Sequence, residues 1–133
     1  MNALVDIFRR IPKDPEKKKN RDKIKEIRNL VKKKQYDEAL RSGIEYLNNV
    51  PENHDVLFIV GGIYYMQEKY SPAILYFDKA LEIGSYDIEV LSLKANAHYH
   101  IGENKRALQC CERIMEIDPK NKFVMELRAK IDG

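Results

Sequence analysis

The chain has 133 residues, of which 44% are hydrophobic and 34% are charged, and its formal net charge is +3. This length suits a single domain that buries a hydrophobic core. No apolar stretch is long enough to span a membrane and the N-terminus lacks a secretory h-region, so we expect a cytoplasmic protein.

The first predicted element is a short amphipathic helix at about residues 2–10. Its apolar side chains recur with helical spacing: Leu4, Ile7, Phe8 and Ile11. Pro12 is expected to end this helix. The helix could cover the start of the following domain, enter another copy to form a homo-oligomer, or rest on an anionic membrane surface. We therefore separate residues 1–19, this helix and a charged linker, from a domain at residues 20–133.

The next predicted helix, at about residues 15–33, lies in a basic part of the chain. Residues 1–34 hold 13 Lys and Arg against 5 Asp and Glu, whereas residues 35–133 hold 11 against 16. Some of the basic residues recur on one helix face and form a basic stripe: Arg21, Lys25, Arg28 and Lys32. The stripe could be a solvated face, or it could bind an acidic protein segment, an anionic surface or nucleic acid. Nucleic acid is disfavoured because the rest of the chain is acidic and no aromatic residue interrupts the stripe.

Six further helices are predicted, at about residues 36–49, 52–68, 71–84, 87–101, 104–117 and 119–131. Some Pro residues follow a capping residue and are expected at first helical positions: Asp14-Pro15, Ser71-Pro72 and Asp118-Pro119. Asn104 or Glu103, after Gly102, is expected to start another helix. Because no apolar run alternates as in a strand, the predicted fold class is all-α.

Three segments of the chain match at a fixed interval of 34 residues: Tyr36–Leu40, Tyr70–Ile74 and Asn104–Leu108. The match extends to earlier residues, where Leu57, Val60, Gly61 and Tyr64 align with Leu91, Lys94, Ala95 and His98. A period of this length with helical patterning indicates stacked helix pairs, in which small residues such as Gly61 let the two helices approach closely. Arrays of this kind bind other proteins.

This pattern resembles the tetratricopeptide repeat family. The segment Ala73-x3-Phe77-x2-Ala80-Leu81 recurs as Ala107-x3-Cys111-x2-Ile114-Met115, and earlier as Ala39-x3-Gly43-x2-Tyr46-Leu47. The resemblance implies a right-handed α-α superhelix of about three helix pairs, with repeats at about 20–53, 54–87 and 88–121 and a capping helix at 119–131. The first repeat matches only in its second half, because Lys23, Glu26 and Ile27 depart from the family pattern.

In this family the first helix of each pair lines a concave groove in which peptide ligands lie. Transferred to this chain, the resemblance implies the following groove residues: Arg21, Lys25, Arg28, Lys32, Phe58, Gly62, Tyr65, Met66, Asn96, Tyr99 and His100. Phe58, Tyr65 and Tyr99 would anchor a peptide, although helix packing is the alternative role for each. Asn96 can bond the backbone of an extended ligand, and the basic stripe favours an acidic one.

Some members of the family hold the acidic C-terminal tail of a chaperone through a two-carboxylate clamp of Lys, Asn, Asn, Lys and Arg. The matching positions of this chain retain none of them and hold Ile24, Arg28, Ile59, Glu89 and Leu93. The resemblance therefore argues against a chaperone-tail adaptor of that type and leaves another acidic ligand open.

The two cysteines, Cys110 and Cys111, are adjacent on a predicted helix. Neighbours on a helix point in different directions and cannot form an unstrained disulfide with each other. Cys111 falls where the family favours an aromatic residue, so we expect a reduced core residue and a reducing compartment.

No catalytic, metal or cofactor site is predicted. His54, His98 and His100 lack companions at a metal-ligand spacing, and His98 takes the place of an inward aromatic side chain. There is no Gly-rich phosphate loop and no nucleophile motif. We therefore expect a non-catalytic interaction scaffold that binds a peptide segment or helix of a partner protein. The alternatives are nucleic-acid or anionic-surface binding through the basic N-terminal region, and self-assembly through the N-terminal helix.

Overall fold

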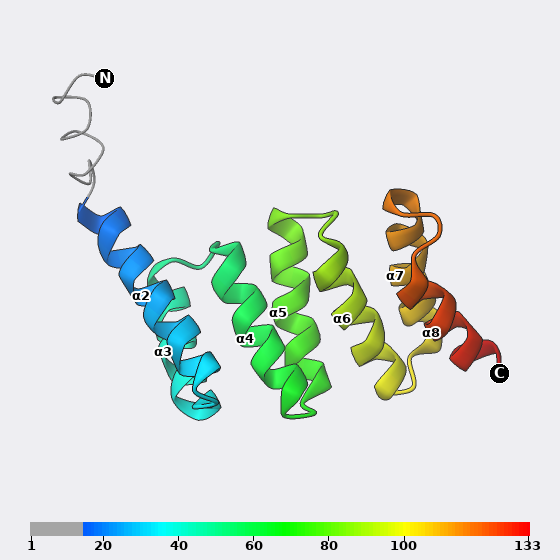
Figure 1. The fold of residues 1–133 in the computed structure, drawn as a ribbon, viewed down its shortest axis with the longest axis horizontal. Coiled ribbons are helices and arrows are strands. Elements are labelled where there is room, and N and C mark those ends of the chain that lie inside the picture. The colour runs from blue at the N-terminus through cyan, green and yellow to red at the C-terminus, as the bar shows by residue number, and fades with distance from the viewer. Residues whose placement is uncertain (1–14) are drawn as a thin grey trace, which may run out of the picture.

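The computed structural model describes residues 15–133, so the predicted helix at 2–10 lies outside the described residues. Within this range the elements are all helices: α2 (Pro15–Lys32), α3 (Tyr36–Asn49), α4 (His54–Met66), α5 (Tyr70–Ile83), α6 (Ile88–His100), α7 (Asn104–Ile117) and α8 (Lys122–Asp132). They follow one another in chain order along the longest axis of the molecule (Figure 1). The predicted all-α class is confirmed.

The helix boundaries repeat with the predicted period. Helices α4, α6 and α8 begin at residues 54, 88 and 122, and α3, α5 and α7 begin at residues 36, 70 and 104. Each start therefore lies 34 residues after the equivalent one. The helix pairs are thus copies of one supersecondary unit, as expected for a stacked array.

The turn within each helix pair has the same left-handed backbone conformation in all three copies. One residue of each turn has a positive φ: Lys34 (60°), Glu68 (60°) and Gly102 (82°). The following N–H bonds back into the first helix, as Lys69 N does to Tyr64 O at 2.9 Å. Such a turn satisfies carbonyl groups at the helix end and reverses the chain at once.

This turn starts the second helix of each pair without a side-chain cap. The N-cap residues make no side-chain capping bond: Gln35, Lys69 and Glu103. The predicted cap at Ser71-Pro72 is therefore wrong, because α5 already begins at Tyr70 and Pro72 lies within its first turn. The predicted start of a helix at Glu103 or Asn104 is confirmed.

The junction between pairs uses side-chain caps instead. In each copy a side-chain oxygen at the N-cap accepts a hydrogen bond from the backbone N–H three residues later: Asn53 from Val56 at 3.0 Å, Asp87 from Val90 at 3.3 Å and Asn121 from Val124 at 3.1 Å. These caps satisfy N–H groups that the first turn of a helix leaves unpaired. The predicted cap at Asp118-Pro119 is wrong, because the last helix begins only at Lys122.

Small residues bring the two helices of a pair close together, as the sequence predicted. The aligned alanines of the second helices are fully buried: Ala39, Ala73 and Ala107. A Cβ atom placed on Gly61 would lie only 2.7 Å from Phe77 Cε1. Because the Phe77 ring is itself fully buried, α4 and α5 leave no room for a side chain at this contact.

The stack curves, with the first helices on its inner side. Helix α4 contacts α6 and α6 contacts α8, whereas within residues 15–133 no comparable contact joins α3 to α5 or α5 to α7. From α4 onward, the first helices of successive pairs are therefore closer together than the second helices. Helix α8 packs against α6 and α7 and buries Val124 and Leu127. The predicted helical-repeat superhelix is confirmed.

No helix in the part of the chain that the structure describes is long and apolar enough to cross a lipid bilayer. Cys110 and Cys111 are buried on α7, so the predicted core position of Cys111 is confirmed. Burial raises the pKa of each thiol, so both stay uncharged at neutral pH.

Candidate functional site

The predicted groove residues lie on three first helices, α2, α4 and α6. The basic stripe is exposed along α2. The middle of the inner wall is formed by α4 and α6, which contact each other directly. These two helices therefore set the distance between the aromatic side chains that the sequence assigns to the groove.

A hydrogen bond joins the two central helices at the predicted groove. Asn96 Nδ2 of α6 donates to Tyr65 Oη of α4 at 2.9 Å. One donor of the amide is occupied in this way, and the Asn96 carbonyl oxygen and the Tyr65 hydroxyl proton remain for further hydrogen bonds. Tyr65 and Asn96 are thus held in fixed orientations that a ligand need not impose on them.

An aromatic cluster surrounds this hydrogen bond. Tyr65 packs edge-on against Tyr70, with ring centroids 5.6 Å apart, and Tyr70 stacks on His100 at 4.8 Å with an interplanar angle of 9°. Tyr99 meets His100 at 5.7 Å. Met66, next to Tyr65, is 51% exposed. The cluster offers a broad, rigid, partly apolar surface of the kind that anchors peptides.

Sequence reasoning missed Tyr70 because it belongs to a second helix, which the family pattern does not assign to the groove. As the first residue of α5, Tyr70 is placed by the left-handed turn at Glu68. It reaches both Tyr65 and His100. The signal available in the sequence was the aromatic residue at this place in two aligned segments, Tyr36 and Tyr70.

Phe58 and Gly62, both predicted to line the groove, have different surroundings in the structure. The Phe58 ring is partly buried and lies 6.3 Å from the Phe77 ring, so it packs against the hydrophobic core. A Cβ atom on Gly62 would meet nothing within 4 Å. Phe58 therefore has a packing role in this structure, whereas Gly62 leaves open space beside α4.

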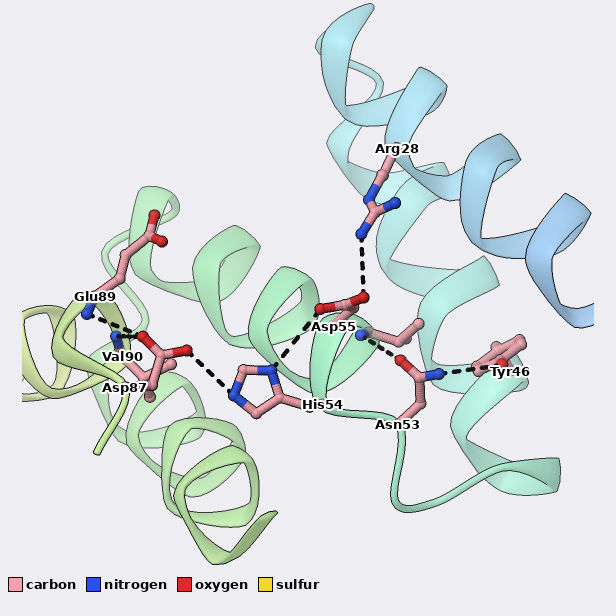
Figure 2. A network of polar contacts seen from close by, with 9 residues as sticks. Arg28, Tyr46, Asn53, His54, Asp55, Asp87, Glu89 and Val90 are labelled. Atoms are coloured by element: carbon pink, nitrogen blue, oxygen red, sulfur yellow. Dashed lines mark hydrogen bonds and ion pairs between the residues drawn. The ribbon is translucent and has the colours of Figure 1, made fainter. Parts of the chain in front are cut away.

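A chain of polar contacts links α2 to the N-terminal ends of α4 and α6 (Figure 2). Arg28 Nη2 lies 3.2 Å from Asp55 Oδ2, and His54 Nε2 lies 3.3 Å from Asp87 Oδ2. His54 Nδ1 is 3.8 Å from the other oxygen of Asp55, which connects the two pairs. Sequence reasoning did not find this network, because its members come from α2, α4 and the cap of α6.

The network changes the charge that a ligand would meet at the basic stripe. Arg28 is partly neutralised by Asp55. Among the side chains of residues 17–133, no ion-pair partner is found for the other basic residues of the stripe: Arg21, Lys25 and Lys32. Those three side chains therefore contribute positive potential along α2 that no described carboxylate pairs with.

His98 is a packed imidazole, as predicted, and is 2% exposed. Its Nδ1 lies 3.0 Å from Glu103 Oε1, a carboxylate partner that sequence reasoning missed. In the range 15–133, no group of three or more His, Cys, Asp or Glu residues is arranged to hold a metal ion.

Comparisons with known proteins agree with this architecture. Residues 88–121 match the family model described as tetratricopeptide repeat. No curated protein has a significant sequence match to the chain.

Solved structures show the same fold. The first tetratricopeptide repeat domain of Spaghetti (RPAP3), bound to the HSP90 peptide SRMEEVD, is 20% identical over 84% of this chain and 90% of that chain, with a TM-score of 0.76. The Hsp90 co-chaperone Cns1 from Saccharomyces cerevisiae is 18% identical over 90% and 40%, with a TM-score of 0.79. The N-terminal domain of stress-induced protein-1 from C. elegans is 15% identical over 87% and 97%, with a TM-score of 0.77.

Proposed function

We propose that this chain, which belongs to the tetratricopeptide repeat family, is a non-catalytic scaffold that binds a peptide segment or helix of a partner protein on the inner side of its superhelix. The observation that carries the proposal is the fixed pair of Tyr65 and Asn96, joined at 2.9 Å in the middle of that side. Free polar groups beside a rigid aromatic surface are what a peptide backbone and its side chains require.

The proposed mechanism is anchoring on a prearranged surface. The Asn96 carbonyl oxygen can accept a bond from a ligand N–H, and the Tyr65 hydroxyl can donate to a ligand carbonyl. Tyr70, Tyr99 and His100 supply apolar area with few rotatable bonds, so little entropy is lost on binding.

The charge of the inner side favours a ligand with acidic residues at one end. Arg21, Lys25 and Lys32 lie on α2, which packs against α3 in the first helix pair. Opposite charge at this end raises the association rate and orients the ligand. The peptide SRMEEVD held by the similar Spaghetti domain is also acidic, which supports this class of ligand. Because the chaperone clamp residues are replaced in this chain, we propose an acidic segment other than such a tail.

A pull-down with a matched control tests the proposal. Proteins captured from a lysate by the unaltered chain are compared with those captured by a Tyr65→Ala, Tyr99→Ala variant. The control is Tyr86→Ala, which removes a 64% exposed tyrosine from the turn between α5 and α6. Circular dichroism checks that all three proteins remain helical.

We expect the double variant to lose specific partners that the Tyr86→Ala control still captures. Equal capture by all three proteins would refute the assigned surface. A second variant, with Arg21, Lys25 and Lys32 changed to Gln, should slow association with the recovered partner at low salt and leave it nearly unchanged at high salt. Lys120, Lys122 and Lys130 changed to Gln give a control with the same net charge.

A further inference from the structure

A pocket of about 510 Å³ lies between α5, α6 and α7. Its walls contain none of the predicted groove residues. The lining residues are Asp78, Lys94, His98, Lys105, Arg106, Gln109, Cys110 and Arg113. The pocket is therefore a second concave feature, separate from the surface proposed to bind a peptide.

The preceding repeat shows why this pocket exists. There, Tyr64 and Tyr76 stack with ring centroids 5.7 Å apart, and Lys79 Nζ lies 5.2 Å from the centre of the Tyr76 ring. In the next copy, 34 residues later, the two tyrosine positions hold His98 and Cys110. Because these side chains are smaller than the tyrosine pair, the same place between the helices is open instead of filled.

The pocket is also positively charged, which the preceding repeat is not. Four basic side chains line it against the single carboxylate of Asp78: Lys94, Lys105, Arg106 and Arg113. The equivalent residues of the preceding repeat are Val60, Ser71, Pro72 and Lys79. Three of the four cations are thus particular to this copy of the repeat.

The four basic side chains of the pocket are only partly paired with other groups of the protein. Lys94 Nζ lies 2.6 Å from Asp78 Oδ1 and forms an ion pair with it. The angles at these two atoms do not meet those of a hydrogen bond. Arg113 donates to the Ser85 carbonyl oxygen, and Arg106 Nε is 3.8 Å from Glu103. Within residues 15–133, Lys105 makes no ion pair. Since each ammonium or guanidinium carries several N–H donors, most donors at the pocket remain unused.

We propose that this pocket binds a phosphate group. A phosphate monoester carries close to two negative charges and three acceptor oxygens, which match an excess of Lys and Arg donors converging from two helices. Burial raises the pKa of the Cys110 thiol, so this wall adds no negative charge that would repel the ligand. The stacked tyrosines exclude such a ligand from the preceding repeat.

The phosphate could be a free ion or belong to a phosphorylated protein segment, and calorimetric titrations distinguish the two. The probes are inorganic phosphate, a short alanine-based peptide with one phosphoserine, and the same peptide with serine. Tighter binding of the phosphopeptide than of inorganic phosphate would support a protein source. Equal affinities would support a free phosphate, and binding of the serine peptide as tightly as the phosphopeptide would overturn the proposal.

Two variants test whether the pocket is the place of binding. Lys105→Gln with Arg106→Gln removes two exposed charges and should weaken phosphate binding about tenfold or more, as expected for lost charge-assisted hydrogen bonds. Lys120→Gln with Lys122→Gln removes two exposed charges outside the pocket and should leave the affinity within about twofold. Equal weakening by both pairs would show diffuse attraction and overturn the proposal.

A filled variant provides an independent test. His98→Tyr with Cys110→Tyr recreates the stacked pair of the preceding repeat while all four cations remain. The variant should keep its helicity and lose phosphate binding. Amide resonances of α6 and α7 should shift on adding phosphate to the unaltered chain and stay fixed in the variant. Unchanged binding by a folded filled variant would refute the pocket as the site.

Discussion

Replacing Gly61 with Ala should destabilise the protein, although the same change normally stabilises the interior of a helix. The added Cβ would lie 2.7 Å from Phe77 Cε1, 2.8 Å from Phe77 Cδ1 and 3.3 Å from Tyr76 Cβ. The Phe77 ring has no exposed surface into which it could move. The two helices must therefore separate, or the ring must leave its rotamer.

The expected change in the free energy of unfolding for Gly61→Ala is the sum of two opposing effects. Gly→Ala within a helix is worth about 0.5–1 kcal/mol of added stability. Overpacking a filled core costs about 1–3 kcal/mol. We expect a net loss of about 1–2 kcal/mol for Gly61→Ala. The neighbouring glycine is the matched control: a Cβ on Gly62 meets nothing within 4 Å, so Gly62→Ala should add about 0.5–1 kcal/mol.

Equilibrium unfolding in urea, followed by circular dichroism, measures both changes. The free energies of unfolding of the two variants should differ by about 2 kcal/mol, because only one added methyl group meets Phe77. In a Phe77→Leu background the penalty of Gly61→Ala should shrink, since the ring edge is gone. Equal stabilisation by Gly61→Ala and Gly62→Ala would refute the close approach of α4 and α5.

Asp87→Ala should lower the free energy of unfolding by about 1 kcal/mol, because Asp87 caps α6 and pairs with His54. Glu116→Ala, which removes an exposed carboxylate of α7, should stay within about 0.5 kcal/mol in the same urea assay, and equal losses would contradict the assigned cap. Stability should also fall as pH rises above the ordinary thiol pKa of 9.0. Burial raises the pKa of Cys110 and Cys111 in the folded state. Between the ordinary pKa and the raised one, the unfolded state therefore releases protons that the folded state retains, which favours unfolding. A Cys110→Ala, Cys111→Val variant should lose less stability over that range, and an equal loss would exclude the thiols as a cause.

The repeat and the fold were readable from the sequence because they depend on positions where size alone decides packing. Ala73 and Ala107 are fully buried at their predicted contacts, and Gly61 admits no side chain. Helices α3 and α7 have the predicted bounds, 36–49 and 104–117. Small residues that recur at these places in a helical repeat indicate close contacts between helices, so the pattern is specific for this fold.

The helix starts were less readable, because a backbone turn sets some of them. A proline after a capping residue predicted a start at Ser71-Pro72, but the left-handed residue Glu68 fixes the start of α5 earlier. Nothing in the side chain of Glu requires this conformation. By contrast, the caps Asp87 and Asn121 could have been found, since they share the 34-residue spacing of the repeat.

The sequence predicted which helix faces would form the candidate groove, but it did not predict the contacts between their side chains. The bond between Tyr65 and Asn96, and the pairing of Arg28 with Asp55, depend on side-chain directions across two helices. The prediction of the groove residues stays a prediction. The pocket beside His98 could be recognised only once the stacked tyrosines of the preceding repeat showed what normally fills that place.

The recurring caps have a consequence for how the length of this molecule can change. A duplicated copy of residues 88–121 would begin directly after Asp87 and end in Asn121, which offers the following helix the same kind of cap. Such an insertion would contact only its immediate neighbours. Gene duplication could therefore lengthen the superhelix one unit at a time.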